Sequence, residues 1–190
     1  MFEEVIGRID AANREDPNRL VVDGVSQPHE WIYSQRLSDW VLKLCPDAAE
    51  ALRIAARGQH VERWTIPRNR YPMDRGGYLR WREELKRFHA NTVTGFMREA
   101  GYAEDAQERV RSIILKKNLA GDRDVQTIED ALCLVFLETQ FGELLAKTPH
   151  AKMVDIVRKT WKKMGDKGRE AALGLTFSDE QKRILEQAIQ

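Results

Sequence analysis

Helical periodicity runs through almost the whole 190-residue chain and limits it to an all-α fold. Apolar residues recur every three or four positions, so each segment presents one apolar face. The predicted helices cover residues 2–13, 29–44, 47–64, 78–100, 104–117, 125–146, 149–164 and 178–189. The only strand-like run is Leu20–Val22, which is too short to build a sheet. We therefore predict a helical bundle that forms a single domain over residues 1–190.

Local signals agree with this prediction. Ser178 precedes the last helix and Gln181 follows three residues later, which is the pattern of a capping box. Residues 65–77 contain two prolines and two glycines and are expected to form an ordered loop. The length also favours one domain, since domains average roughly 150 residues.

The charge balance restricts the class of partner. Lys and Arg total 31 and Asp and Glu total 30, so the net charge is +1 and a uniformly basic nucleic-acid binder is excluded. No apolar run approaches the roughly 18 residues that span a membrane. The first residues lack the basic start and apolar stretch of a signal peptide, so we expect a cytoplasmic protein with no membrane partner.

One segment is nevertheless strongly basic. Between Arg57 and Arg87 there are nine Lys or Arg residues against four acids, together with four Trp or Tyr residues. The planar guanidinium group suits phosphate, and aromatic rings can stack on a base. We predict that Arg63, Arg68, Arg70 and Lys117 bind a small phosphorylated ligand, with RNA as a less favoured partner. The alternative is a solvated helix face held by Arg–Glu pairs.

Three polar residues on separate apolar helices predict a metal site: His60, His89 and Asp130. Imidazole and carboxylate suit Zn, Mn, Fe or Mg, and a shared divalent ion would supply the partner that buried polar groups need. Glu62 or Glu129 is the candidate general base. The alternative is that each histidine is an ordinary hydrogen-bonded residue and that no cofactor is bound.

The motifs resemble an uncharacterised domain-of-unknown-function family from bacteria, plants and fungi. The resemblance covers nearly the whole chain and rests on Gln59–Trp64, Ile66–Arg68, Tyr71–Pro72, Phe88–Ala90 and Glu129–Glu138. Some members carry an automatic label similar to glutamyl-tRNA synthetase. This chain contains neither the His-x-Gly-His nor the Lys-Met-Ser-Lys-Ser signature of that enzyme class.

More distantly, the layout resembles the all-α HD-domain metal phosphohydrolases. His60 after an Ala-rich helix, His89 on the next helix and the late Asp130 match the order of their metal ligands. The adjacent His-Asp pair is missing, and either His29 or Arg36 could match the early ligand. The resemblance implies a metal-dependent phosphohydrolase acting on a nucleotide or small phosphate ester. The alternative is a non-catalytic nucleotide- or RNA-binding module with a degenerate metal site; a di-iron oxygenase has too few ligands here.

Overall fold

The computed structural model describes all 190 residues, and most of them are helical. Two strands, β1 (Arg19–Val22) and β2 (Val25–Pro28), form a single short hairpin. The α-helices are α1 (Phe2–Arg14), α2 (His29–Leu44), α3 (Glu50–Gly58), α4 (Arg75–Glu99), α5 (Glu104–Ile114), α6 (Arg123–Val135), α7 (Phe141–Leu145), α8 (His150–Lys163), α9 (Asp166–Leu173) and α10 (Asp179–Ile189). The all-α prediction is confirmed.

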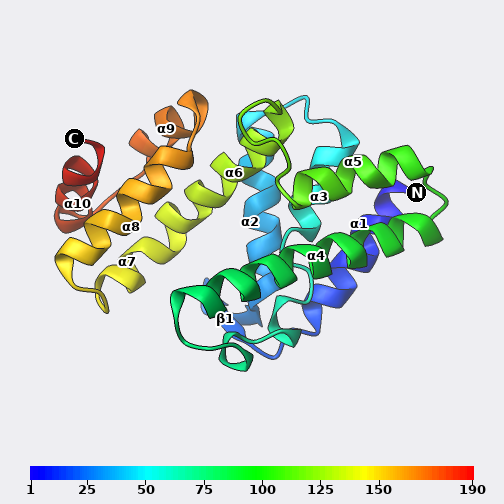
Figure 1. Cartoon of the computed structure of the whole chain (residues 1–190), viewed down its shortest axis with the longest axis horizontal. Helices are drawn as coiled ribbons and strands as arrows, with labels where there is room; N and C mark the ends of the chain where they lie inside the picture. The colour runs from blue at the N-terminus through cyan, green and yellow to red at the C-terminus, as the bar shows by residue number, and fades with distance from the viewer.

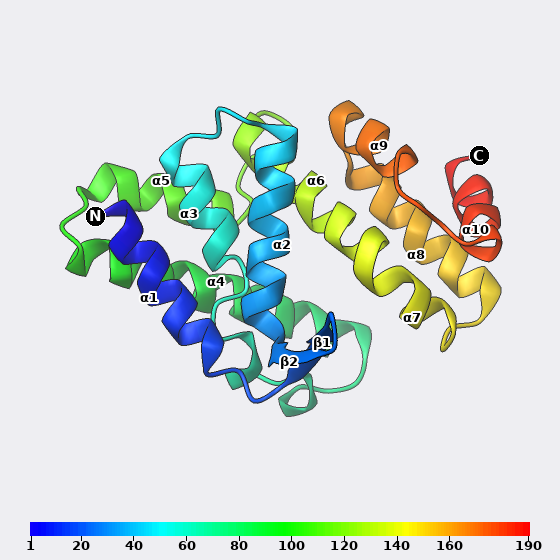
Figure 2. The ribbon, with the colours of Figure 1, turned by 180° about the vertical axis from the view of Figure 1, so that it is seen from behind.

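The helices form two groups joined by a central pair. In Figure 1, α1, α3, α4 and α5 lie to the right and α7 to α10 lie to the left. Helices α2 and α6 pack against each other between the groups, and α6 continues into the C-terminal group, where it contacts α8 and α9. Figure 2 shows the same division from behind, with the hairpin at the lower end of α2.

One hydrophobic core holds the two groups together. It contains 35 buried residues, from Val5 in α1 to Ala188 in α10. Leu37 of α2 and Leu134 of α6 are fully buried where the groups meet. Since burying a leucine side chain stabilises a fold by roughly 1.5–3 kcal/mol, this continuous core favours a single folding unit. No helix is long and apolar enough to cross a membrane.

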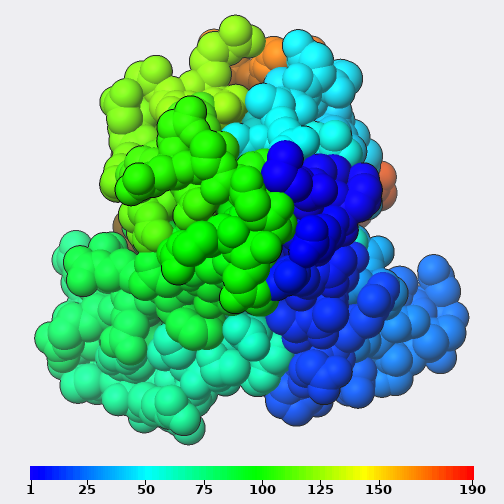
Figure 3. All heavy atoms as spheres, turned by 90° about the vertical axis from the view of Figure 1, so that its right-hand side faces the viewer, coloured from blue at the N-terminus to red at the C-terminus, as the bar shows by residue number.

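The strand-like run extends further than the sequence analysis expected. Leu20–Val22 belongs to β1, which pairs antiparallel with β2. Asp23 and Gly24 form the turn and both have positive φ, 50° and 79°. An Asp-Gly pair favours this two-residue hairpin turn because glycine and aspartate tolerate positive φ. In Figure 3 the hairpin, in blue, and the loop region before α4, in teal, project at opposite lower corners.

Two predicted helices are not continuous over their predicted ranges. The helix predicted over 47–64 ends at Gly58, and Glu62 then has a φ of +52°, which no right-handed helix contains. The chain instead buries Val61 and forms two short 3₁₀ turns, at Arg63–Thr65 and Arg68–Arg70. The predicted 125–146 helix is interrupted by a π-helical turn at Phe136–Gln140.

The last helix begins as predicted. The Ser178 hydroxyl accepts a hydrogen bond from the Gln181 amide, and the Gln181 side chain accepts one from the Ser178 amide, at 2.9 Å. The capping box is therefore present. The short helix α9, which the sequence analysis missed, follows α8 after a turn at Gly165 and packs on α6.

Candidate functional site

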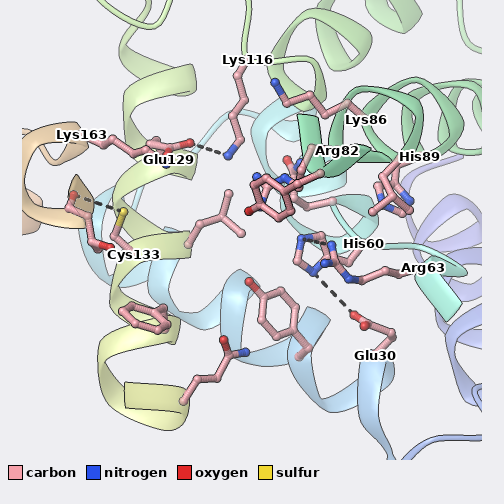
Figure 4. Close-up of a pocket in the computed structure, with 18 of the residues that line it drawn as sticks. Glu30, His60, Arg63, Arg82, Lys86, His89, Lys116, Glu129, Cys133 and Lys163 are labelled. Carbon is pink, nitrogen blue, oxygen red and sulfur yellow. Dashed lines mark hydrogen bonds and ion pairs between the residues drawn. The ribbon is translucent and has the colours of Figure 1, made fainter. Parts of the chain in front are cut away.

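A polar cavity of about 460 Å³ lies between α2, α4, α6 and the C-terminal end of α8. The turn after α3 adds Gln59, His60 and Arg63 to its lining. Figure 4 shows two groups of labelled side chains in it, one around Glu30, His60 and His89 and one around Lys116 and Glu129. The volume falls in the range of small-molecule sites, roughly 300–1,000 Å³.

The first group contains two neutral histidines. His60 stacks on Tyr33 at 4.5 Å between ring centroids and lies 5.8 Å from His89. Burial, helped by the nearby charge of Arg63, lowers the pKa of His60 to about 4. Burial and the neighbouring His60 lower the pKa of His89 to about 3. Both rings are therefore uncharged at neutral pH.

The tautomer of His89 is set by its neighbour. Its Nδ1 lies 2.8 Å from the Val61 carbonyl oxygen, which can only accept, so Nδ1 carries the hydrogen. The Nε2 atom of His89 is consequently a lone-pair acceptor, and this buried atom has no hydrogen-bond partner.

Glu30 is the carboxylate of this group and is 6% exposed. Its two oxygens face histidines, with Oε1 3.4 Å from His29 Nδ1 and Oε2 3.6 Å from His60 Nδ1. Burial by itself raises the pKa of Glu30, but the contacts with His29 and then His60 outweigh it and bring the pKa to about 2. Glu30 is therefore ionised, and it raises the pKa of His29 in return.

Lys116 and Glu129 form the centre of the second group. They make a buried ion pair in which the side chains are 12% and 6% exposed, and Lys163 of α8 approaches Glu129 at 3.5 Å. Burial lowers the pKa of Lys116, while Glu129 opposes that shift. Two cations from opposite sides of α6 thus share a single carboxylate.

The backbone at Lys116 is strained. Helix α5 ends in a Schellman motif, with the Lys117 amide donating to Ser112 and the Lys116 amide donating to Ile113, each at 3.0 Å. Lys116 occupies the left-handed position of this motif, with φ +57°. The same motif at the end of α4 has Gly101 there, with φ +87°. Placing a non-glycine residue in this region costs roughly 1–2 kcal/mol.

Three further cations complete the lining: Arg63, Arg82 and Lys86. The Arg63 guanidinium stacks over Trp81 at 4.9 Å and places Nη1 3.5 Å from His60 Nε2. The cavity therefore holds five Lys or Arg side chains against two carboxylates, an excess of three positive charges.

The structure brings His60 and His89 together but excludes Asp130, contrary to the predicted metal triad. The Asp130 carboxylate faces α9, where Oδ1 accepts hydrogen bonds from the Gly165 amide and from Gln126, both at 2.8 Å. Asp130 points about 100° away from its neighbour on α6, and this rotation turns it from the cavity toward α9. The acid of this pair that lines the cavity is the one before it. That acid is Glu129.

Other predicted residues also lie outside the cavity. Arg68 donates to the carbonyls of Tyr71 and Pro72 and so holds its own loop, and Arg70 donates to the Thr65 carbonyl. Two more lie apart from the cavity lining: Glu62, whose amide donates to Asn13, and Lys117, which pairs with Glu108 on the surface. Of the four predicted phosphate-binding residues only Arg63 lines the cavity, because the proline-rich loop uses its arginines to satisfy its own carbonyls.

Several lining residues were not among the predicted site residues, including Glu30, Arg82, Lys116 and Lys163. Glu30 follows His29 at the start of a helix, where an acid is common for reasons of helix polarity alone. Lys116 precedes the predicted Lys117, and only the left-handed backbone turn decides which of the two points inward. No sequence signal connects Lys163 with Glu129, which lies 34 positions earlier.

Two sets of side chains contain ligand atoms suited to a metal ion. Asp16, His29 and Glu30 place one ligand atom each within 4.8 Å of one another. The Asp16 carboxylate is already used, since it accepts from both nitrogens of Asn18 and from the Glu30 amide. The second set, His60, His89 and Glu30, keeps an unpartnered His89 Nε2 and an unpartnered Glu30 Oε2, but its three ligand atoms do not lie within 4.8 Å of one another.

Comparisons with known proteins identify a family but no activity. No curated protein and no solved structure matches the chain. One family model, described as Domain of unknown function (DUF4202), matches residues 3–185 and thus nearly the whole fold, including every residue of the cavity. The chain therefore belongs to the DUF4202 family.

Proposed function

We propose that this protein binds a small phosphorylated molecule, about the size of a mononucleotide, in the cavity between α2, α4, α6 and α8. The observation that carries the proposal is Lys116, a lysine in a left-handed position that the same motif fills with glycine at the end of α4. Strain of this kind persists where a side chain has a role that offsets its cost. The Lys116 side chain reaches the cavity, so its role lies there.

The charge of the cavity supports an anionic ligand. Five cations surround a space with two carboxylates, and one of these, Glu129, faces both Lys116 and Lys163, so one lysine charge stays uncompensated. A phosphate group offers the same lysines more acceptor oxygens than one carboxylate does. The partly enclosed shape favours a small molecule over an RNA strand, which would require an open basic track.

A phosphate titration tests the proposal. Binding of inorganic phosphate and of a nucleoside monophosphate is measured by calorimetry for the wild type, Lys116→Met and the neighbouring control Lys117→Met. Losing a charge-assisted hydrogen bond costs about 1.5–3 kcal/mol, so Lys116→Met should bind roughly 10- to 150-fold more weakly. Lys117→Met should bind like the wild type, because Lys117 pairs with Glu108 outside the cavity.

A second pair of variants, at Arg82 and Arg80, keeps the proposal testable if Lys116→Met does not fold. Arg82 lines the cavity and is only partly buried, whereas Arg80 on the same helix is exposed. Arg82→Gln should weaken phosphate binding and Arg80→Gln should not. If neither phosphate nor the nucleotide binds the wild type, the proposal is wrong.

Metal-dependent phosphohydrolysis, the activity of the HD-domain enzymes that the sequence resembles, is the second candidate. The unpartnered His89 Nε2 favours it, because a metal-binding histidine typically donates its other ring nitrogen to a backbone carbonyl, as His89 does. His60, His89 and Glu30 would hold the ion, with Glu30 in the place predicted for Asp130. A bound divalent ion would polarise the phosphoryl group and activate water. Elemental analysis of untagged wild type and His89→Gln tests this: a stoichiometric metal only in the wild type is expected.

A further inference from the structure

The buried polar atoms without partners divide by position. Three belong to residues that line the cavity, Glu30 Oε2, Gln59 Oε1 and His89 Nε2, and three lie elsewhere, on Asn13, Trp31 and Gln35. The three elsewhere are all N–H donors. The three cavity atoms are all hydrogen-bond acceptors.

The existing contacts of each residue identify its unpartnered cavity atom as a hydrogen-bond acceptor. The Gln59 amide nitrogen faces the Ile114 carbonyl at 3.4 Å, so its Oε1 is left over. His89 Nδ1 donates to the Val61 carbonyl, which leaves the Nε2 lone pair. Glu30 is an ionised carboxylate whose Oε2 lies 3.6 Å from His60, beyond hydrogen-bond distance.

These acceptors belong to residues that are nearly inaccessible, with exposures of 6% for Glu30, 3% for Gln59 and 2% for His89. Buried acceptors that lack a donor destabilise a fold, and a ligand that supplies donors removes that cost. Figure 4 shows Glu30 and His89 apart from Lys116 and Glu129, with Arg82 between the two groups in that view. The cavity thus has a cationic end at Lys116 and Lys163, and an opposite end with the unpartnered acceptors, where Arg63 lies beside His60.

We propose that the ligand is a polyhydroxylated phosphate ester, whose phosphate lies at the cationic end and whose hydroxyl groups donate to Glu30, Gln59 and His89. A sugar phosphate and the ribose phosphate part of a nucleotide share this chemistry. Hydroxyls suit this end because each one brings a donor to an acceptor that lacks one. This inference rests on the proposed binding of a phosphorylated ligand and specifies its class.

The experiment compares three probes that share a phosphate group: inorganic phosphate, propyl phosphate, which adds a chain without hydroxyls, and ribose 5-phosphate, which adds several hydroxyls. Affinities are measured by calorimetry with a chelator present, so that no divalent ion takes part. The wild type should bind ribose 5-phosphate at least about tenfold more tightly than propyl phosphate, since several hydrogen bonds are added. Equal affinities for these two esters would overturn the inference and leave phosphate binding intact. Failure of all three probes would instead overturn the proposed function.

Two variants test which residues cause the preference for ribose 5-phosphate over propyl phosphate, and a third variant is the matched control. Gln59→Leu and His89→Phe should each reduce the ribose 5-phosphate affinity about three- to tenfold and leave the propyl phosphate affinity unchanged. Gln35→Leu removes a buried unpartnered amide of α2 outside the cavity lining and should change neither affinity. If both Gln59→Leu and His89→Phe keep the full preference, the hydroxyls bind elsewhere and the assignment is wrong.

Repeating the ester titrations with Mn²⁺ in place of the chelator separates hydroxyl binding from metal binding. The inference expects the ribose 5-phosphate preference to be the same with chelator and with Mn²⁺. A preference that exists only with Mn²⁺ and is lost in His89→Phe would assign these acceptors to a metal ion and overturn the inference.

Discussion

The lowered pKa of His89 makes the free energy of unfolding of the protein depend on pH. His89 is 2% exposed and its pKa is lowered to about 3 by burial and by His60, whereas an unfolded histidine has a pKa of about 6.5. Below pH 6.5 the unfolded chain therefore binds a proton that the folded chain does not. Stability falls as the pH falls through this range, because protonation favours the unfolded state.

The size of the effect at pH 5 follows from these values. One pKa unit corresponds to 1.36 kcal/mol, so 1.5 units between 6.5 and 5 give a loss of about 2 kcal/mol. Since pH 5 lies well above the folded-state pKa of about 3, nearly all of this loss is expected. His60 adds a loss in the same direction, and His29, whose pKa is raised by Glu30, opposes it. Comparing the wild type with His89→Gln isolates the contribution of His89.

The assay is urea unfolding followed by circular dichroism at about pH 7.5 and about pH 5. The wild type should lose about 2 kcal/mol more between these conditions than His89→Gln, which cannot take up a proton. The control is His150→Gln, at an exposed histidine of α8, and it should keep the wild-type loss. Equal losses in the wild type and His89→Gln would refute the reasoning, including the lone pair assigned to Nε2.

Four further predictions concern the stability of the fold. A Cβ at Gly168 would lie 2.5 Å from Asp130 Cγ, so Gly168→Ala should destabilise the fold by about 1–3 kcal/mol in urea unfolding. Gly95→Ala, with nothing within 4 Å of its Cβ, should instead stabilise α4 by about 0.5–1 kcal/mol; a loss there would contradict the open space. Ser178→Ala removes the capping box and should cost about 1 kcal/mol by the same measurement, so an unchanged midpoint would dispute that cap. Leu134→Ala, at a fully buried site, should lower the free energy of unfolding by about 2–5 kcal/mol, and a smaller loss would mean that the core collapses around it.

Much of the fold follows from sequence pattern, and the departures occur where single residues override the pattern. The amphipathic segments fold as helices because each has one apolar face to bury against the core. The helix predicted to reach Trp64 stops early because Gly58 packs closely on Val93 and Glu62 adopts a left-handed conformation. The spacing of apolar residues does not reveal the backbone conformation of a single residue such as Glu62. The Asp23-Gly24 turn did carry a recognisable hairpin signal.

The cavity was only partly predictable from sequence. His60 and His89 were identified because polar residues beside apolar faces need partners, and they do lie together. Arg63 and the candidate general base Glu129 also line the cavity as predicted. The predicted metal ligand Asp130 and phosphate ligand Lys117 do not, and each is one residue away from a lining residue, Glu129 and Lys116. At Asp130 a shift of one position on α6 rotates the side chain by about 100°, so the assignment requires the angle at which that helix packs. At Lys117 the assignment requires the left-handed backbone of Lys116, which follows the end of α5.

The left-handed lysine has an evolutionary consequence. For the fold alone, glycine at position 116 combined with an uncharged residue at position 129 relieves the strain at the end of α5 and leaves no buried carboxylate unpaired. Selection acting on stability alone would therefore tend to remove this lysine, and selection on the cavity would retain it. Homologues that carry glycine at this position are expected to have lost the ligand. Such homologues should also replace the acid at position 129, because a buried carboxylate that loses its main cation is costly to keep.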